Sequence, residues 1–195
     1  IKRLGKADFK NETIAQATLA DCIIRYVSNN PPKDRNILRT GNKLPLVEGT
    51  EKDKLFFRNW FIQEEDVKIT KIIWNYFEAV KKKWPIAWGN LDFILTKSTG
   101  IIALMRFLKD IVKYYALDKL IDINGFTEVL ENVKLNDNEF INDRFRAGGV
   151  GQSDLYKVLS NSFLKDVQIC QKPHRYDSKF NKLPDGQEFY MEGRR

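Results

Sequence analysis

The chain has 195 residues, of which 43% are apolar and 30% charged, a balance typical of a soluble globular protein with a hydrophobic core. Its formal charge of +7 favours polyanionic partners through long-range attraction. No apolar run approaches the roughly 18 residues that cross a bilayer, and no signal peptide opens the chain, so the sequence predicts no membrane partner.

The two cysteines, Cys22 and Cys170, are too few for a disulfide framework. They predict a reducing, cytoplasmic setting, with Cys22 as a small core residue. Because the chain starts at Ile1 rather than at a methionine, we expect a processed product or a part of a longer protein, with a neighbouring domain missing.

The first predicted helix covers residues 11–28, where apolar side chains recur at helical spacing. The prolines at positions 31 and 32 should end it. Residues 34–50 are expected to form a loop with at most one short helical turn. The aromatic run at 54–63 is compatible with either a strand or a helix, because periodicity cannot separate the two over so short a stretch.

Two long helices follow. Residues 64–84 carry a 3.6-residue apolar stripe, acidic residues at the start and Lys81, Lys82 and Lys83 at the end, which suits the helix dipole. Residues 98–117 carry a wider stripe and predict a central core helix, capped by Ser98 or Thr99.

The remaining sequence predicts a turn at Asn124–Gly125 leading into a short helix, and a last helix over 153–167 with Ser153 as its cap. Residues 171–195 are poor in apolar side chains and should form an extended tail on the surface. The chain is therefore expected to be mostly α, with a compact helical domain of about five to seven helices in residues 1–170 and a C-terminal tail in 171–195.

The stretch RFRAGGVGQSD, residues 144–154, resembles a phosphate-holding loop, because glycines let the backbone approach an anion and a helix start offers unpaired N–H groups. It is neither a Walker A loop nor a dinucleotide loop, since no Gly-Lys-Ser/Thr follows and no strand precedes it. A mobile connector before a capped helix is the better explanation of the stretch. We favour a connector with a secondary anion-binding role, carried by Arg144, Arg146, Gly148, Gly149, Gly151 and Ser153.

Two further stretches allow the same pair of interpretations. Lys97 and its neighbours Ser98 and Thr99 could grip a phosphate, although helix capping explains the hydroxyls. Trp84 and Trp88 beside three lysines resemble a stacking surface for single-stranded nucleic acid. Core packing is the better interpretation for Trp84, and Trp88 is left open.

No catalytic constellation is visible. The single histidine, His174, lies in the predicted tail, and with Cys170 it supplies only two of the ligands that a zinc site needs. The carboxylates show no metal-binding spacing. The sequence thus predicts no metal, no cofactor and no catalytic residue.

Residues 13–38, 55–88, 93–111 and 147–159 resemble, in order and spacing, the C-terminal part of DGQHR-domain proteins. That grouping includes regulators of DNA phosphorothioation of the DndB type and related defence-island proteins of bacteria. The resemblance covers residues 11 to about 160. The naming Asp-Gly-Gln-His-Arg motif is absent: Asp185, Gly186 and Gln187 are followed by Glu188, at the wrong end of the chain, so chemistry tied to that motif cannot be transferred.

The resemblance implies a role in DNA modification, phage defence or their regulation. On this basis we expect the basic surface to contact DNA backbone through Lys97, Arg106, Arg144, Arg146 and Lys157, with the glycine loop adding N–H groups. Arg106 lies opposite the main apolar stripe of its helix and should face outward. Lys157, one turn into the last helix, should reinforce an anion at the start of that helix.

Two alternatives remain. One is a docking or dimerisation module for a protein partner, with the aromatic residues Phe56, Phe57, Trp60 and Phe61 as the contact if they are exposed. The other is a nuclease or nucleotide hydrolase, which needs clustered carboxylates or a true phosphate loop.

Overall fold

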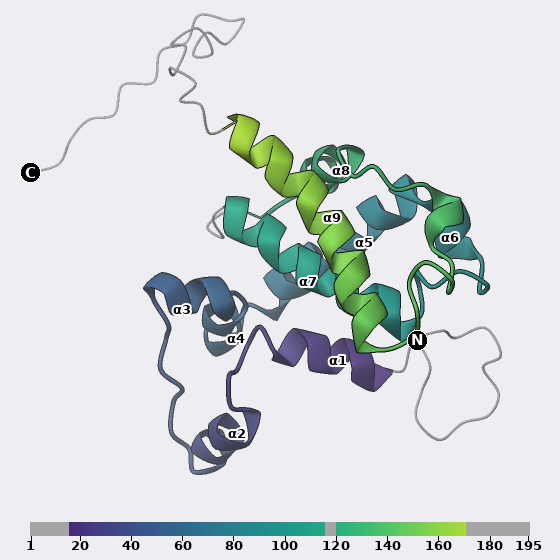
Figure 1. The fold of residues 1–195 in the computed structure, drawn as a ribbon. Helices are drawn as coiled ribbons and strands as arrows, with labels where there is room; N and C mark the ends of the chain where they lie inside the picture. Colours follow the sequence, from purple (N-terminus) through teal and green to yellow (C-terminus); the bar gives the residue numbers. More distant parts are fainter. Residues whose placement is uncertain (1–15, 116–119, 171–195) are drawn as a thin grey trace, which may run out of the picture.

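A computed structural model describes residues 16–115 and 120–170, and these ranges contain helices and no strand. The predicted mostly α fold is confirmed, while residues 171–195, the predicted tail, lie outside the described ranges. The described helices outnumber the predicted five to seven because several are short (Figure 1). They are α1 (Gln16–Ile24), α2 (Pro31–Arg39), α3 (Gly49–Lys54), α4 (Arg58–Ile62), α5 (Asp66–Lys83), α6 (Pro85–Gly89), α7 (Ser98–Tyr115), α8 (Ile123–Glu131), the 3-10 helix η1 (Asp137–Glu139) and α9 (Gly149–Cys170).

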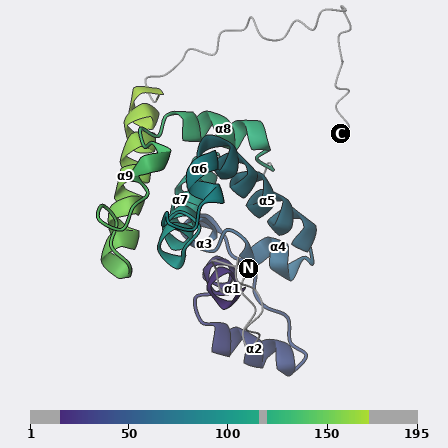
Figure 2. The ribbon, with the colours of Figure 1, turned by 90° about the vertical axis from the view of Figure 1, so that its right-hand side faces the viewer.

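Helix α7 is the centre of the core. Ten of its 18 residues are buried, which agrees with the wide apolar stripe of the sequence. Helix α9 packs along α7, α1 also contacts α7, and α5 packs against α8 (Figures 1 and 2). Two buried tyrosine hydroxyls bind to the backbone of α7. Tyr26 donates to the carbonyl of Met105 at 2.7 Å, and Tyr76 of α5 donates to that of Leu104 at 2.8 Å.

The predicted core roles of two residues are confirmed. Cys22 is buried in the main apolar cluster, and burial raises the pKa of its thiol. Trp84 is 1% exposed, and its indole N–H donates to the carbonyl of Leu135 at 2.7 Å. Trp88, which the sequence left open, is half-buried and lies against Phe77.

The predicted loop over 34–50 is wrong in its first part, because α2 continues to Arg39. Prolines stop a helix that precedes them, but they also suit the first turn of a new one, where the missing N–H has no partner. Here the Asn30 side chain caps α2 by accepting from the backbone N–H of Lys33 at 3.1 Å, and both prolines follow. The aromatic run at 54–63 forms part of α3 and α4 rather than a strand.

The predicted turn at Asn124–Gly125 is also wrong, since both residues belong to α8. The carboxylate of Asp122 accepts from the backbone N–H of Gly125 at 2.8 Å and so supplies the cap that lets the helix begin before the glycine. Within the described ranges, no helix has the length and apolar character needed to span a membrane.

Candidate functional site

The predicted anion-binding loop joins the end of the irregular segment after η1 to the start of α9. Gly148 has a φ of +95°, a conformation that side-chain-bearing residues rarely adopt. Helix α9 begins at Gly149, so the prediction that Ser153 caps it is wrong: Ser153 lies in its second turn. Gly149 and Gly151 belong to the first turn of α9, so the helix begins before the residue that the capping pattern indicates.

Gly151 is explained by close packing of the backbone. A Cβ atom at this position would lie 1.8 Å from the carbonyl oxygen of Arg146, far inside van der Waals contact. The chain therefore folds back over the first turn of α9, and its own carbonyl covers part of the surface that an anion would need. In contrast, a Cβ at Gly149 would meet nothing within 4 Å.

The cations around this loop are mostly engaged. Arg144 forms an ion pair with Glu139 and lies over the ring of Phe145. Lys157 lies 3.4 Å from Asp154 on the solvent face of α9. Arg146 is exposed and forms no ion pair within the described ranges.

The segment of the chain that contains the loop is acidic in composition. Residues 120–170 contain five Lys or Arg but eight Asp or Glu, whereas residues 16–115 contain 17 Lys or Arg and 11 Asp or Glu. The positive excess of the described chain thus belongs to its first two thirds.

Arg106 and Ser153 are brought together, but between two helices rather than on an open surface. The guanidinium of Arg106 donates to the Ser153 hydroxyl at 3.3 Å and lies 4.3 Å from the ring centre of Tyr156. The carboxylate of Asp110, one turn further along α7, accepts from Tyr156 at 2.8 Å and from Ser160 at 3.2 Å. We call Arg106, Asp110, Ser153, Tyr156 and Ser160 the polar seam. Arg106 is half-buried in it, because α9 covers the face of α7 that the sequence predicts to be exposed.

The polar seam should contribute measurably to stability. Burial and the hydrogen bond to Asp110 both raise the pKa of Tyr156, so the phenol stays a donor at neutral pH. Replacing Asp110 with alanine leaves two donors without their acceptor and should lower the free energy of unfolding by about 2 kcal/mol. Replacing Asp154, whose pair with Lys157 is exposed, should change it by less than about 0.5 kcal/mol. Urea denaturation measures both, and equal losses would contradict this role of the seam.

Lys97 stands apart from the other predicted contacts. Its ammonium group lies 3.4 Å from the carbonyl of Asp92, within its own loop. Thr99 and Gly100 next to it are buried, and a Cβ at Gly100 would meet the carbonyl of Leu95 at 2.2 Å. The backbone carbonyls of Ile94 and Leu95 cover the start of α7, so the hydroxyl of Thr99 is not accessible to a phosphate.

A second basic feature emerges on α2, which projects from the end of the molecule opposite α8 in both views (Figures 1 and 2). We call residues 30–43 the basic arm. It carries Lys33, Arg35, Arg39 and Lys43, all exposed, and a single carboxylate, that of Asp34. None of the α2 residues is buried, so this helix presents most of its surface to solvent.

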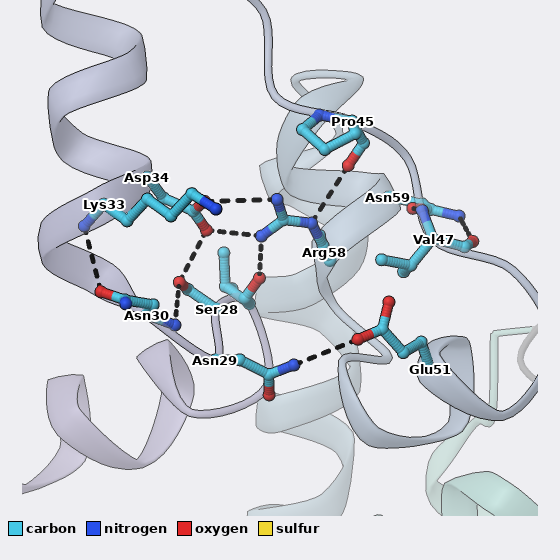
Figure 3. Close-up of polar contacts among 11 residues, drawn as sticks. Ser28, Asn29, Asn30, Lys33, Asp34, Pro45, Val47, Glu51, Arg58 and Asn59 are labelled. Atoms are coloured by element: carbon cyan, nitrogen blue, oxygen red, sulfur yellow. Dashed lines mark hydrogen bonds and ion pairs between the residues drawn. The ribbon is translucent and has the colours of Figure 1, made fainter.

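The carboxylate of Asp34 is turned inward and neutralised (Figure 3). Arg58 of α4, 5% exposed, donates to its two oxygens at 2.6 and 3.4 Å, and Ser28 donates at 2.6 Å. The hydrogen bond from Arg58 is the main reason that the pKa of Asp34 falls below its ordinary value, so the group stays ionised and paired.

The same guanidinium fixes the chain on either side of the basic arm. It donates to the carbonyl of Val27 at 3.0 Å and to that of Pro45 at 3.1 Å (Figure 3). Three segments of the chain therefore meet at this one buried side chain: the turn after α1, helix α2, and the stretch that follows α2. Sequence reasoning missed Arg58, although a lone arginine within an aromatic run is a signal for a buried ion pair.

The aromatic contact predicted for a protein partner is mostly inside the core. Phe56 is 3% exposed and Phe57 is fully buried, so the prediction fails for both. Trp60 is half-buried, and Phe61 is exposed. The run serves packing, with its last residue left at the surface.

Two of the cavities on the described surface concern the candidate site. The first, of about 450 Å³, contains Trp60 and polar side chains that are already paired: Lys68 with Glu65 at 2.5 Å, and Asn59 with the backbone of Val47. The second, of about 410 Å³, is an apolar groove between α1, α2, α4 and α5. Neither presents a catalytic arrangement, and within the described ranges no three metal-ligating side chains come together.

Cys170 and His174 supply too few ligands for the sequence to predict a zinc site. His174 lies outside the described ranges, and the side chain of Cys170 is not described either. The chain matches no known family model, no curated protein and no solved structure.

Proposed function

We propose that this chain is a helical module that binds the phosphate backbone of DNA, within a bacterial protein of the DGQHR type linked to DNA modification or phage defence. The sequence resemblance supplies the biological setting. The observation that carries the DNA contact is the basic arm: four exposed cations share this segment with one carboxylate, and Arg58 already neutralises that carboxylate.

Arg35 and Arg39 are the central contacts of this proposal. They lie one helical turn apart on α2, where like charges cost a few tenths of a kcal/mol in a free helix. Within the described ranges neither has an acidic partner. A row of phosphates placed against this face would relieve the repulsion and release counterions from the nucleic acid.

The geometry of the basic arm suits a duplex better than a buried ligand. All four of its cations are exposed, and Lys33 and Arg39 line neither of the two cavities described above, so the arm fits an extended charged surface. Contacts of this kind position a protein on DNA without reading its sequence. The contribution of Arg144 and Arg146 stays a prediction, and the ion pair of Arg144 with Glu139 makes it the weaker one.

Two double variants with the same loss of charge distinguish the basic arm from the glycine loop as the DNA contact. Replacing Arg35 and Arg39 with alanine should weaken binding to a short duplex by about tenfold at low salt, because two phosphate contacts are lost. Replacing Arg144 and Arg146 should weaken it by less than about threefold, since Glu139 already holds one of them. Fluorescence anisotropy measures both affinities, and an equal loss in the two variants would reduce the effect to net charge and contradict a site on the basic arm.

A further inference from the structure

The apolar groove combines exposed side chains from three separate helices. Ile24 of α1 is 41% exposed, Leu38 of α2 is 48% exposed and Phe61 of α4 is 40% exposed, and all three line the same hollow. Single exposed apolar residues are ordinary on a protein surface. Three that converge on one groove of about 410 Å³ form a single apolar hollow, in which the apolar side chains of a partner would be buried.

The charges on the rim of the groove indicate what that partner carries. The carboxylate of Asp34 is neutralised by Arg58, and Asp66 lies in the first turn of α5, where the positive end of the helix offsets part of its charge. Arg35 borders the groove with no acidic partner in the described ranges, and Arg39 follows one turn later. The α2 side of the groove is thus positive, whereas the α5 side carries the exposed carboxylate of Asp66.

We infer that the apolar groove docks an acidic amphipathic helix of a partner protein. Its apolar side chains would enter the hollow between α1, α2 and α5, and its carboxylates would face Arg35 on the α2 side. Helices commonly lay apolar residues at i, i+3 or i+4, and i+7 into such grooves. This goes beyond the proposed contact with DNA: the two surfaces share Arg35, so a docked acidic helix and a DNA backbone should compete for the basic arm.

The test uses a labelled synthetic peptide of about four helical turns, with leucine at the groove-facing positions and glutamate on the flanks. A second peptide carries lysine in place of each glutamate. Fluorescence anisotropy without DNA should show the acidic peptide binding at least tenfold more tightly than the basic one. In the charge-reversed variant Arg35→Glu this preference should disappear or invert, which a merely apolar surface would not produce.

The apolar part of the site has its own matched controls. Replacing Ile24 and Leu38 with serine should weaken binding of the acidic peptide at least tenfold. The same change at Ile86 and Leu91, which are 59% and 45% exposed on and beside α6, should have no effect. Both pairs are at the surface, so the variants should fold, and neither alters a cation of the basic arm. Binding to DNA should therefore persist in the Ile24 and Leu38 variant even where peptide binding is lost.

Three outcomes would overturn the inference: equal affinity for the two peptides, peptide binding that survives loss of Ile24 and Leu38, or no binding of the acidic peptide at all. Sedimentation of the protein alone adds a fourth. A dimer that the Ile24 and Leu38 variant abolishes would assign the groove to a second copy of this chain instead. None of these results depends on whether the basic arm binds DNA.

Discussion

Replacing Gly151 with alanine should destabilise the protein by about 3 kcal/mol, although the residue lies in a helix, where alanine is normally favoured. The added methyl group would lie 1.8 Å from the carbonyl oxygen of Arg146, and that atom belongs to the backbone, so it cannot rotate away. Either the loop or the first turn of α9 must shift. For a chain of this size the change should lower the melting temperature by roughly 6–12 °C.

Gly149 provides the matched control, two residues earlier on the same helix. Its Cβ would meet nothing, and its φ is not positive, so Gly149→Ala should fall within about 0.5 kcal/mol of the wild type. Differential scanning calorimetry compares the two. If both variants melt like the wild type, the loop yields easily and the glycines serve something other than packing, such as the anion-binding role expected from the sequence.

Replacing Arg58 with methionine should cost about 3–5 kcal/mol at neutral pH, the second large effect. The change leaves the carboxylate of Asp34 poorly solvated without its partner and removes the donors for the carbonyls of Val27 and Pro45. Because these groups hold both ends of the basic arm, the arm should also become sensitive to proteases. Arg39→Met, on the exposed face of α2, should change the stability by less than about 0.5 kcal/mol.

The wild type and the Arg58→Met variant should differ in their response to acid. In the wild type the pKa of Asp34 lies below its ordinary value of about 3.9, so its pairing stabilises the fold above that pH and is lost as the pH falls through the lowered value. Without Arg58 the carboxylate of Asp34 loses the main cause of its lowered pKa, so its pKa should return toward the ordinary value. The deficit of Arg58→Met should therefore shrink as the pH falls from about 5 to about 3 in urea titrations, and a deficit that is constant over this range would contradict the ion pair.

The long helices were predictable because their residues repeat a pattern over many turns. The stripe of Ile69, Ile72, Tyr76 and Val80 faces the core as expected, and so does that of α7. Helices α2 and α8 were missed in part because proline and glycine have two meanings at helix ends. Pro31 starts a helix, and Gly125 is accommodated once Asp122 caps α8.

The surroundings of the basic arm and of the glycine loop were less predictable, because they depend on contacts between residues that are distant in the sequence. Arg58 and Asp34 are 24 positions apart, and nothing local in either segment reveals the pair. Arg106 was placed at the surface because it lies opposite the apolar stripe, but a central helix is covered on more than one side, here by α9. Gly151 resembled an anion-binding residue, and only the path of the chain shows the carbonyl of Arg146 against it.

The most direct measurement of the central claim is the salt dependence of DNA binding, because each phosphate contact adds a fixed amount to the slope of log K against log salt. If the basic arm lies on the phosphates, the slope for the Arg35→Ala and Arg39→Ala variant should be shallower than that of the wild type by about two. Parallel lines for the two proteins would mean that these arginines touch no phosphate, and the basic arm would not be the DNA-binding surface.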